Sequence, residues 1–136
     1  MYKPYSSKKN METYMRKKEK TLPNMIAETQ AVFNRWIRER DKNLSCICCG
    51  SFNTAHAAHY FSAGNHSSLR FSEMNVNSCC VKCNTFLHGN LINYRHGLIK
   101  KYGEANVKLL ELSASLNRVK KWSRFELVLI IEKYKL

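Results

Sequence analysis

Hydrophobic residues recur every three or four positions in the first third of the chain, between Met25 and Ile37. This spacing predicts an amphipathic helix over about residues 24–41, because positions three and four apart share one face of a helix. A break at residues 21–24, which holds proline and helix-capping residues, marks its start. Residues 11–20 have weaker helical character and are strongly cationic.

The last third of the chain also has helical spacing, in three segments. The first segment ends near Gly103, a natural helix stop, and Ser123 and Glu126 have the spacing of a capping box that opens the third. We expect the apolar stripes of the first two segments to face the core. They consist of Leu91, Ile92, Tyr94, Leu98, Ile99 and Tyr102, and of Ala105, Leu109, Leu112, Leu116 and Val119.

The centre of the chain has a different pattern. Residues 50–78 lack helical spacing and are rich in Ser, Asn and Gly. Short strands are predicted around residues 55–61 and 69–76, joined by a loop through residues 64–68. The sequence therefore predicts an α+β protein with helices on both sides of a small centre that contains strands.

Charge separates the same three regions. The chain of 136 residues has 23 Lys and Arg against 10 Asp and Glu, a net charge of +13. Residues 1–45 and 91–136 each have a net charge of +6, whereas residues 46–90 have +1 and contain all six cysteines and four of the five histidines. So large a positive charge favours a polyanionic partner, most often nucleic acid. We expect a Cys/His-rich chemical site between two basic regions that bind this partner.

The length fits one domain after a short leader. No apolar run approaches the ~18–20 residues that a membrane span needs, and residues 1–20 lack the apolar stretch of a secretory signal. We therefore expect a cytoplasmic protein with no membrane partner. The predicted parts are a basic leader at 1–23 and a single domain at 24–136, with a helix at 24–45, the core at 46–90 and a helical region at 91–136.

Two pairs of cysteines have the C-x-x-C spacing of metal-binding knuckles, Cys46 with Cys49 and Cys80 with Cys83. Two such pairs can place four thiolates tetrahedrally around one Zn²⁺ ion, and Gly50 permits the tight turn after the first pair. Four cysteine ligands leave no open position, so this zinc would be structural. A disulfide framework is the alternative, and the missing secretory signal argues against it.

The two remaining cysteines are Cys48 and Cys79. We expect both to be small buried residues, although either could replace its neighbour as a zinc ligand. The two C-x-x-C pairs are about 30 residues apart, which exceeds the ~15–20 of a simple zinc ribbon. A further segment is therefore inserted between them, and it holds several polar residues of chemical interest.

The inserted segment resembles the HNH, or ββα-metal, nucleases. In that family a histidine ends the first strand, an asparagine lies five residues before a knuckle cysteine, and a histidine or asparagine follows the last one; His59, Asn75 and Asn84 fit these places. Across residues 46–103 the chain also resembles the phage NinG (Rap) recombination proteins, through the motifs C-x-x-C-G, H-A-A-H-Y, L-R-F, N-V-N, C-x-x-C-N and G-N-L. This resemblance implies a small zinc-stabilised HNH-like core flanked by N- and C-terminal helices.

The resemblance also implies a role for each polar residue. His59 would be the general base that deprotonates the attacking water, and Asn75 would orient its imidazole through the amide oxygen. Asn84 would be a ligand of a catalytic Mg²⁺ or Mn²⁺ ion, which prefers oxygen. Many HNH sites have an aspartate where this chain has Ala58, so His56 is the expected second ligand. A β-bulge would be required, because strand residues three apart face opposite sides.

A few basic residues near the core are expected to contact phosphates. Arg70 lies in the L-R-F motif that the family resemblance marks, and it is one of only two basic residues in the centre. The further candidates, taken from the second knuckle and the helix that follows it, are Lys82, Arg95, Lys100 and Lys101.

Two functions from different classes fit these features. The first, which the resemblance implies, is a metal-dependent DNA endonuclease in recombination that cuts branched DNA such as Holliday junctions or D-loops. Such a protein would work in a bacterial host cell, and two cuts at a junction favour a homodimer. The second is a non-catalytic, zinc-stabilised DNA-binding module in which His59 and the asparagines have structural roles only.

Overall fold

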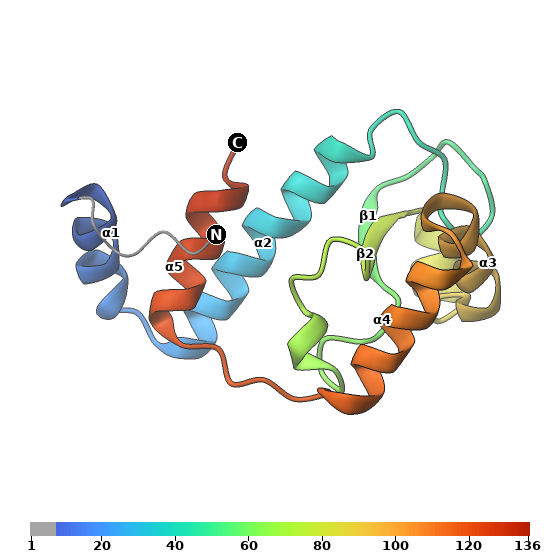
Figure 1. Ribbon diagram of the computed structural model, residues 1–136. Coiled ribbons are helices and arrows are strands. Elements are labelled where there is room, and N and C mark those ends of the chain that lie inside the picture. Colours follow the sequence, from blue (N-terminus) through green and yellow to red (C-terminus); the bar gives the residue numbers. More distant parts are fainter. Residues whose placement is uncertain (1–7) are drawn as a thin grey trace. The chain divides into compact units, whose positions relative to one another are not determined.

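The structure is a computed structural model that describes residues 8–136 (Figure 1). The described chain divides into two compact units, one made of residues 8–33 and 122–136 and the other of residues 34–121. The long helix α2 (Leu22–Arg40) belongs with its first part to one unit and with its last part to the other. Residues 1–7 of the predicted leader lie outside the described residues, and the predicted division at residue 23 stays a prediction.

The first unit is helical, as its sequence pattern predicts. It contains α1 (Lys8–Lys18), the first part of α2 and α5 (Arg124–Tyr134), and α1 packs on α5. The rings of Phe33 and Tyr134 meet edge to face, 4.8 Å apart, in its core. Both ends of the predicted capping box are present, since Ser123 accepts the Glu126 backbone N–H and Glu126 reaches back to the Ser123 N–H.

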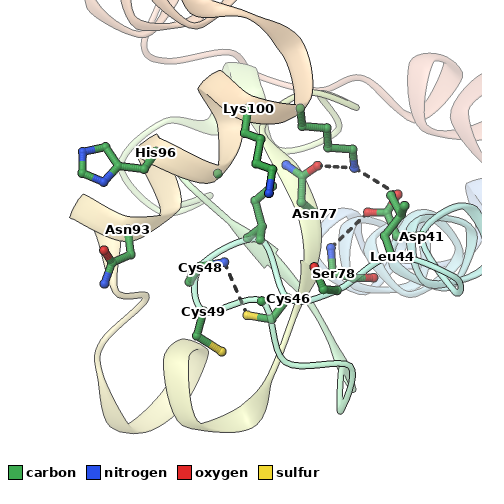
Figure 2. A pocket seen from close by; sticks show the side chains of 15 residues that line it. Asp41, Leu44, Cys46, Cys48, Cys49, Asn77, Ser78, Asn93, His96 and Lys100 are labelled. Carbon is green, nitrogen blue, oxygen red and sulfur yellow. Dashed lines mark hydrogen bonds and ion pairs between the residues drawn. The ribbon is translucent and has the colours of Figure 1, made fainter.

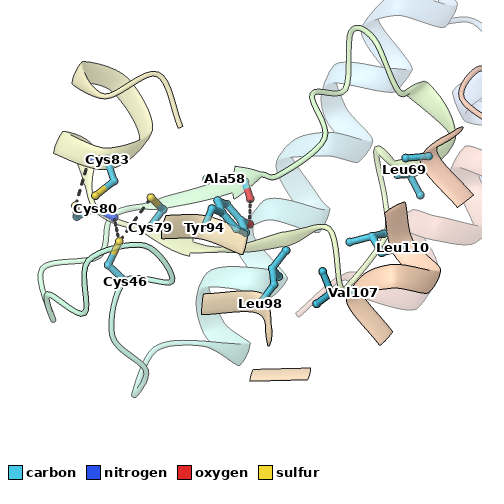
Figure 3. Packing of buried hydrophobic residues seen from close by; sticks show 11 residues of the cluster. Cys46, Ala58, Leu69, Cys79, Cys80, Cys83, Tyr94, Leu98, Val107 and Leu110 are labelled. Carbon is cyan, nitrogen blue, oxygen red and sulfur yellow. Dashed lines mark hydrogen bonds between the residues drawn. The ribbon is translucent and has the colours of Figure 1, made fainter. Parts of the chain in front are cut away.

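The second unit is an α+β structure around a small sheet. β1 (His56–His59) and β2 (Val76–Cys79) pair antiparallel, with His56 opposite Cys79 and His59 opposite Val76. Tyr94 is fully buried, and its hydroxyl donates to the carbonyl of Ala58 at 2.6 Å, which ties a helix to β1 (Figure 3). The other elements of this unit are η1 (Ser67–Leu69), the π-helical turn η2 (Lys82–Phe86), α3 (Leu91–Tyr102) and α4 (Glu104–Leu116).

The α+β class is confirmed, with mostly helices and one two-stranded sheet among the described residues. The second predicted strand, at residues 69–76, is wrong: Leu69 ends the short helix η1, and the strand begins only at Val76. All four residues of β2 are buried, including Asn77 and Ser78, so β2 has no alternation of apolar and polar residues for the sequence to display.

The predicted buried stripe of α4 is also wrong. Leu109, Leu112 and Leu116 are more than half exposed. The buried residues of this helix are instead Val107, Leu110 and Ala114, which have the same helical spacing on another face. Apolar residues occupy more than one face of α4, so periodicity alone does not reveal which face its neighbours cover. Within residues 8–136, none of the helices is long and apolar enough to cross a membrane.

A polar network in the second unit joins the end of α2 to β2 and α3. Oδ1 of Asp41 lies 2.7 Å from Nε of Arg40 and 3.1 Å from Nζ of Lys101, and Oδ2 accepts the Ser78 backbone N–H at 3.1 Å. Asn77 Oδ1 accepts from Arg40 at 3.2 Å and from Lys101 at 2.8 Å. Burial raises the pKa of Asp41, but the hydrogen bonds from Arg40 and Ser78 and the two positive charges outweigh this, so its pKa is lowered.

Replacing Asp41 with asparagine should therefore lower the free energy of unfolding of this unit by about 2–3 kcal/mol, because two cations would lose a buried partner. Fully buried pairs lose more, but Arg40 and Lys101 keep about a fifth of their side-chain surface exposed. Denaturant unfolding at neutral pH measures the loss. The difference from wild type should shrink as the pH falls below the ordinary aspartate pKa of 3.8. Glu39→Gln, at an exposed ion pair, is the control and should change stability by less than about 0.5 kcal/mol.

Candidate metal centre

Four sulfur atoms from the two C-x-x-C pairs meet in the second unit. The Sγ atoms of Cys46, Cys49, Cys80 and Cys83 all lie within 4.8 Å of one another, and those of Cys49 and Cys80 are 3.7 Å apart. This is the predicted ligand set, in the predicted register. A four-cysteine cluster of this size could hold a metal ion such as zinc.

The first cysteine pair lies on a tight loop that is fixed to its neighbours. Gly50 has a φ of 77°, a left-handed conformation that favours glycine, and its N–H donates to the Cys46 carbonyl at 3.0 Å. The Ile47 N–H donates to the Ser78 carbonyl of β2 at 3.1 Å. On the other side the loop touches α3 at Gly97, where a Cβ atom would lie 1.8 Å from the Ile47 carbonyl oxygen. Only glycine allows α3 to approach the loop this closely.

The second cysteine pair lies where β2 passes into η2, and a strained turn closes behind it. His88, Gly89 and Asn90 all have positive φ values, between 48° and 93°. The turn folds back onto the cluster, because the Gly89 N–H donates to the Cys83 carbonyl at 2.9 Å and the Asn90 amide donates to Cys83 Sγ at 3.4 Å. Asn90 and Gly97 support the cluster but are not among the predicted site residues, although the sequence His-Gly-Asn after the knuckle is a turn signal.

Backbone N–H groups point at the sulfur atoms, as suits thiolates. Cys46 Sγ accepts the N–H of Cys48 at 3.4 Å and of Cys80 at 3.3 Å, and Cys80 Sγ accepts the N–H of Cys83 at 3.4 Å. Burial raises the pKa of Cys46, but the N–H groups of Cys49, Cys80 and Cys48 outweigh it and lower the pKa to about 6. Metal binding requires deprotonated thiols. The backbone N–H groups favour that form at Cys46, whereas burial and the neighbouring sulfur atoms of Cys80 and Cys49 raise the pKa of Cys83 to about 12.

The two other cysteines lie beside this cluster. Cys79 is fully buried as predicted, whereas Cys48 is only half-buried. Cys48 and its neighbours line a cavity of about 550 Å³ between the first cysteine loop and α3. One end of this cavity is lined by Asp41, Asn77 and Lys101 of the polar network (Figure 2). Asn93, His96 and Lys100 line its other side.

The predicted general base is held by a backbone carbonyl. Nε2 of His59, at the end of β1, lies 3.0 Å from the Arg70 carbonyl oxygen. A carbonyl only accepts, so Nε2 carries the hydrogen and Nδ1 holds the free lone pair of the neutral ring. Burial and the Arg70 charge lower the pKa of His59, despite the opposing hydrogen bond, so the ring is neutral at pH 7.

The hydrogen-bond partners of Asn75 differ from the one predicted, the imidazole of His59. Asn75 is fully buried, its Oδ1 accepts the Phe61 N–H at 2.8 Å, and its Nδ2 donates to the carbonyls of Phe61 and Leu69 at 3.0 and 3.1 Å. The contact expected between Asn75 and His59 is therefore replaced by the Arg70 carbonyl. Asn75 instead ties Phe61, which follows β1, to Leu69, the last residue of η1 and the neighbour of Arg70.

The two predicted ligands of a divalent ion lie side by side. Nδ2 of Asn84 is 2.9 Å from Nδ1 of His56. The register of β1 and β2 is regular from His56 to His59, so the expected bulge is not present between these strands. Alternation along β1 therefore places His56 and His59 on opposite faces of the strand.

The predicted phosphate contacts fall into two groups. Lys82 and Lys100 are exposed, and Arg70 is half-buried. Two others have acidic partners: Arg95 pairs with Glu111 at 2.5 Å, and Lys101 is in the Asp41 network. Their part in binding nucleic acid stays a prediction.

The fold and the cysteine cluster define a small α+β protein with a four-thiol site that could hold a metal ion such as zinc. Residues 3–136 match the family model described as Bacteriophage Lambda NinG protein. The chain therefore belongs to the NinG family of phage proteins.

Curated relatives from three phages support this assignment. The chain is 38% identical to "Protein ninG" of Escherichia phage 933W over 111 residues, which cover 80% of the chain and 54% of the relative. It is 39% identical to that of Escherichia phage lambda over 95 residues, 68% of the chain and 47% of the relative. For Salmonella phage P22 the identity is 42% over 88 residues, 63% and 43% of the two chains. The chain thus spans about half the length of the curated relatives it matches. No solved structure matches it.

Proposed function

We propose that this protein is a metal-dependent DNA endonuclease of the HNH type that acts in phage recombination on branched DNA, such as Holliday junctions or D-loops. The observation that carries the proposal is the state of His59: a neutral imidazole fixed through Nε2 to the Arg70 carbonyl, with its Nδ1 lone pair left to accept a proton. A general base at neutral pH needs a neutral ring with one nitrogen able to accept a proton, and this arrangement supplies both.

In the proposed reaction, Nδ1 of His59 takes a proton from a water molecule as that water attacks the phosphorus atom. The new P–O bond forms, the bond to the 3′ oxygen breaks, and the Arg70 carbonyl stabilises the imidazolium that results by accepting from Nε2. When bound, Mg²⁺ or Mn²⁺ would offset negative charge on the phosphate and on the leaving oxygen. His56 and Asn84 are adjacent neutral ligands for that ion, and the phosphate would supply the negative oxygen.

The four-cysteine cluster has a structural role in this proposal. Its coordination is complete with Zn²⁺ bound, so it does not activate water. It fixes the loop after Asp41 to the end of β2 and to η2, and thereby holds Asn84, the residue after Cys83, in place.

The alternative, a zinc-stabilised DNA-binding module without catalysis, is favoured by two observations. His56 and His59 lie on opposite faces of β1, and the His56–Asn84 pair includes no carboxylate. Incubating the protein with branched and linear DNA in Mg²⁺ or Mn²⁺ separates the two functions. Cleavage that requires the divalent ion supports the nuclease; tight binding without cutting in either metal supports the module.

Binding itself should depend on the exposed lysines near the centre. Charge reversals at Lys82 and Lys100 should each weaken DNA binding, and the slope of log K against log salt should fall by about 0.9 for each phosphate that the protein no longer neutralises. Affinity measured over a range of salt concentrations tests this. Lys108→Glu, the same charge change on an exposed residue of α4 that pairs with Glu104, is the matched control. An equal effect in all three variants would mean that the charge acts without a local binding surface.

A further inference from the structure

We infer that Cys46, Cys48 and Cys79 hold a second Zn²⁺ ion, with Cys46 as a thiolate shared between the two ions. The cluster would then use all six cysteines of the chain and contain two metal ions. This inference rests on zinc at the four-cysteine site, because Cys46 belongs to both, but it does not depend on DNA cleavage.

The distances between the sulfur atoms match a shared ion. Two thiolates bound tetrahedrally at about 2.3 Å lie about 3.8 Å apart. Cys79 Sγ is 3.7 Å from Cys46 Sγ (Figure 3). It is 3.9 Å from Cys48 Sγ, and the three sulfur atoms all lie within 4.8 Å of one another. The distance between Cys49 Sγ and Cys80 Sγ in the four-cysteine site is also 3.7 Å.

A backbone hydrogen bond also holds this second group of cysteines together. The hydrogen bond from the Ile47 N–H to the Ser78 carbonyl holds the loop against β2, so that Cys46 and Cys48, on either side of Ile47, face the residue after Ser78. That residue is Cys79, which is fully buried. Neither Cys48 nor Cys79 is needed for the four-thiolate site, and yet Cys79 Sγ lies 3.7 Å from Cys46 Sγ, and Cys48 Sγ lies within 4.8 Å of the same atom.

The surroundings allow an ion to enter and to complete its coordination. Cys46 and Cys48 line the cavity beside α3, which gives access from solvent (Figure 2). The Gly89 carbonyl oxygen lies 3.5 Å from Cys48 Sγ, on the strained turn that also supports the first site. This oxygen or a water molecule can take the fourth position of a tetrahedral ion.

The chemistry of the three ligands defines the class of ion. Thiolates select soft or borderline ions such as Zn²⁺ and exclude Mg²⁺ and Mn²⁺, which prefer oxygen. The second site is therefore distinct from the divalent site proposed at His56 and Asn84. A disulfide between Cys48 and Cys79 is the competing use of the same two sulfur atoms.

The test is the zinc content of the whole chain, purified under reducing conditions, for wild type, Cys48→Ser and Cys79→Ser. We expect about two ions per wild-type chain and about one in each variant. Cys48 is only half-buried, so Cys48→Ser should fold even if the change at Cys79 disturbs the core. Cadmium NMR of the substituted wild type adds a direct readout, since a shared sulfur couples the two metal signals to each other.

The outcomes separate the two sites. One zinc per wild-type chain that Cys48→Ser retains overturns the second site and leaves the first in place. No zinc at all overturns both. A peptide that joins Cys48 to Cys79 through a disulfide in the reduced preparation, or two cadmium signals without mutual coupling, also overturns the shared cluster.

Discussion

Replacing both Cys80 and Cys83 with serine is expected to remove bound zinc and to abolish the cooperative unfolding of residues 34–121. Structural zinc in small sites contributes about 10–16 kcal/mol at neutral pH, which is as large as the whole stability of a typical domain, about 5–15 kcal/mol. The sheet of this unit has only two strands, and four of the residues in its buried core are cysteines, so loss of the metal removes a large part of the interactions that hold it together. Calorimetry and metal analysis on the same samples measure both effects. Excess chelator should likewise remove zinc from the wild-type protein and abolish the cooperative unfolding of this unit.

Cys48→Ser is the matched control for this experiment. It makes the same chemical change two residues from Cys46 and keeps all four predicted ligands of the first site, so the folded unit should persist and should keep the zinc of that site, whether or not it loses a second ion. A double variant that unfolds at the wild-type temperature with unchanged cooperativity would show that the four thiols are packed core residues and not a metal centre.

Replacing His59 with alanine is expected to reduce DNA cleavage by about 10²–10⁴-fold, the usual contribution of a general base, and to leave DNA affinity unchanged. Rates under single-turnover conditions and binding measured without divalent metal give the two quantities separately. His96→Ala, at an exposed position of α3, is the control and should cut at the wild-type rate. If His59→Ala cuts as fast as wild type, the base is another group.

The pH dependence of cleavage gives the same residue a second test. The pKa of His59 is lowered from 6.5, so the ring stays neutral, and able to accept a proton, through the whole neutral range. We therefore expect the rate to fall only when the pH drops below 6.5 and the imidazole becomes protonated. If the midpoint of the fall in cleavage rate on the acid side lay above pH 6.5, the lowered pKa of the buried His59 would not control the reaction.

The sequence predicted those features that depend on local spacing. The helix of Met25, Phe33 and Ile37, the capping box at Ser123 and the register of the four-cysteine cluster each follow from residues a few positions apart, and the structure has them all. The family resemblance correctly led to NinG. These features are local because helical periodicity, caps and knuckles are each encoded in one short segment.

Features that depend on distant partners could not be predicted in the same way. β2 has a polar sequence because Asn77 and Ser78 are satisfied by Arg40, Lys101 and Asp41, which come from other elements. The partner of His59 is a backbone carbonyl, which leaves no trace in residue type. In α4, the choice of buried face depends on which helix packs against it, and several faces are apolar.

Helix α2 is divided between two units, and this has a consequence for hydrogen exchange. We expect the amides up to Phe33 to be protected by the packing of residues 8–33 and 122–136, and those from Asn34 to Arg40 by the unit that contains the cysteine cluster. Opening events that are local to one unit then expose one end of a continuous helix and leave the other closed. Withdrawal of metal should accelerate exchange from Asn34 onward, so the boundary between the two cooperative units would be visible as a step within one helix.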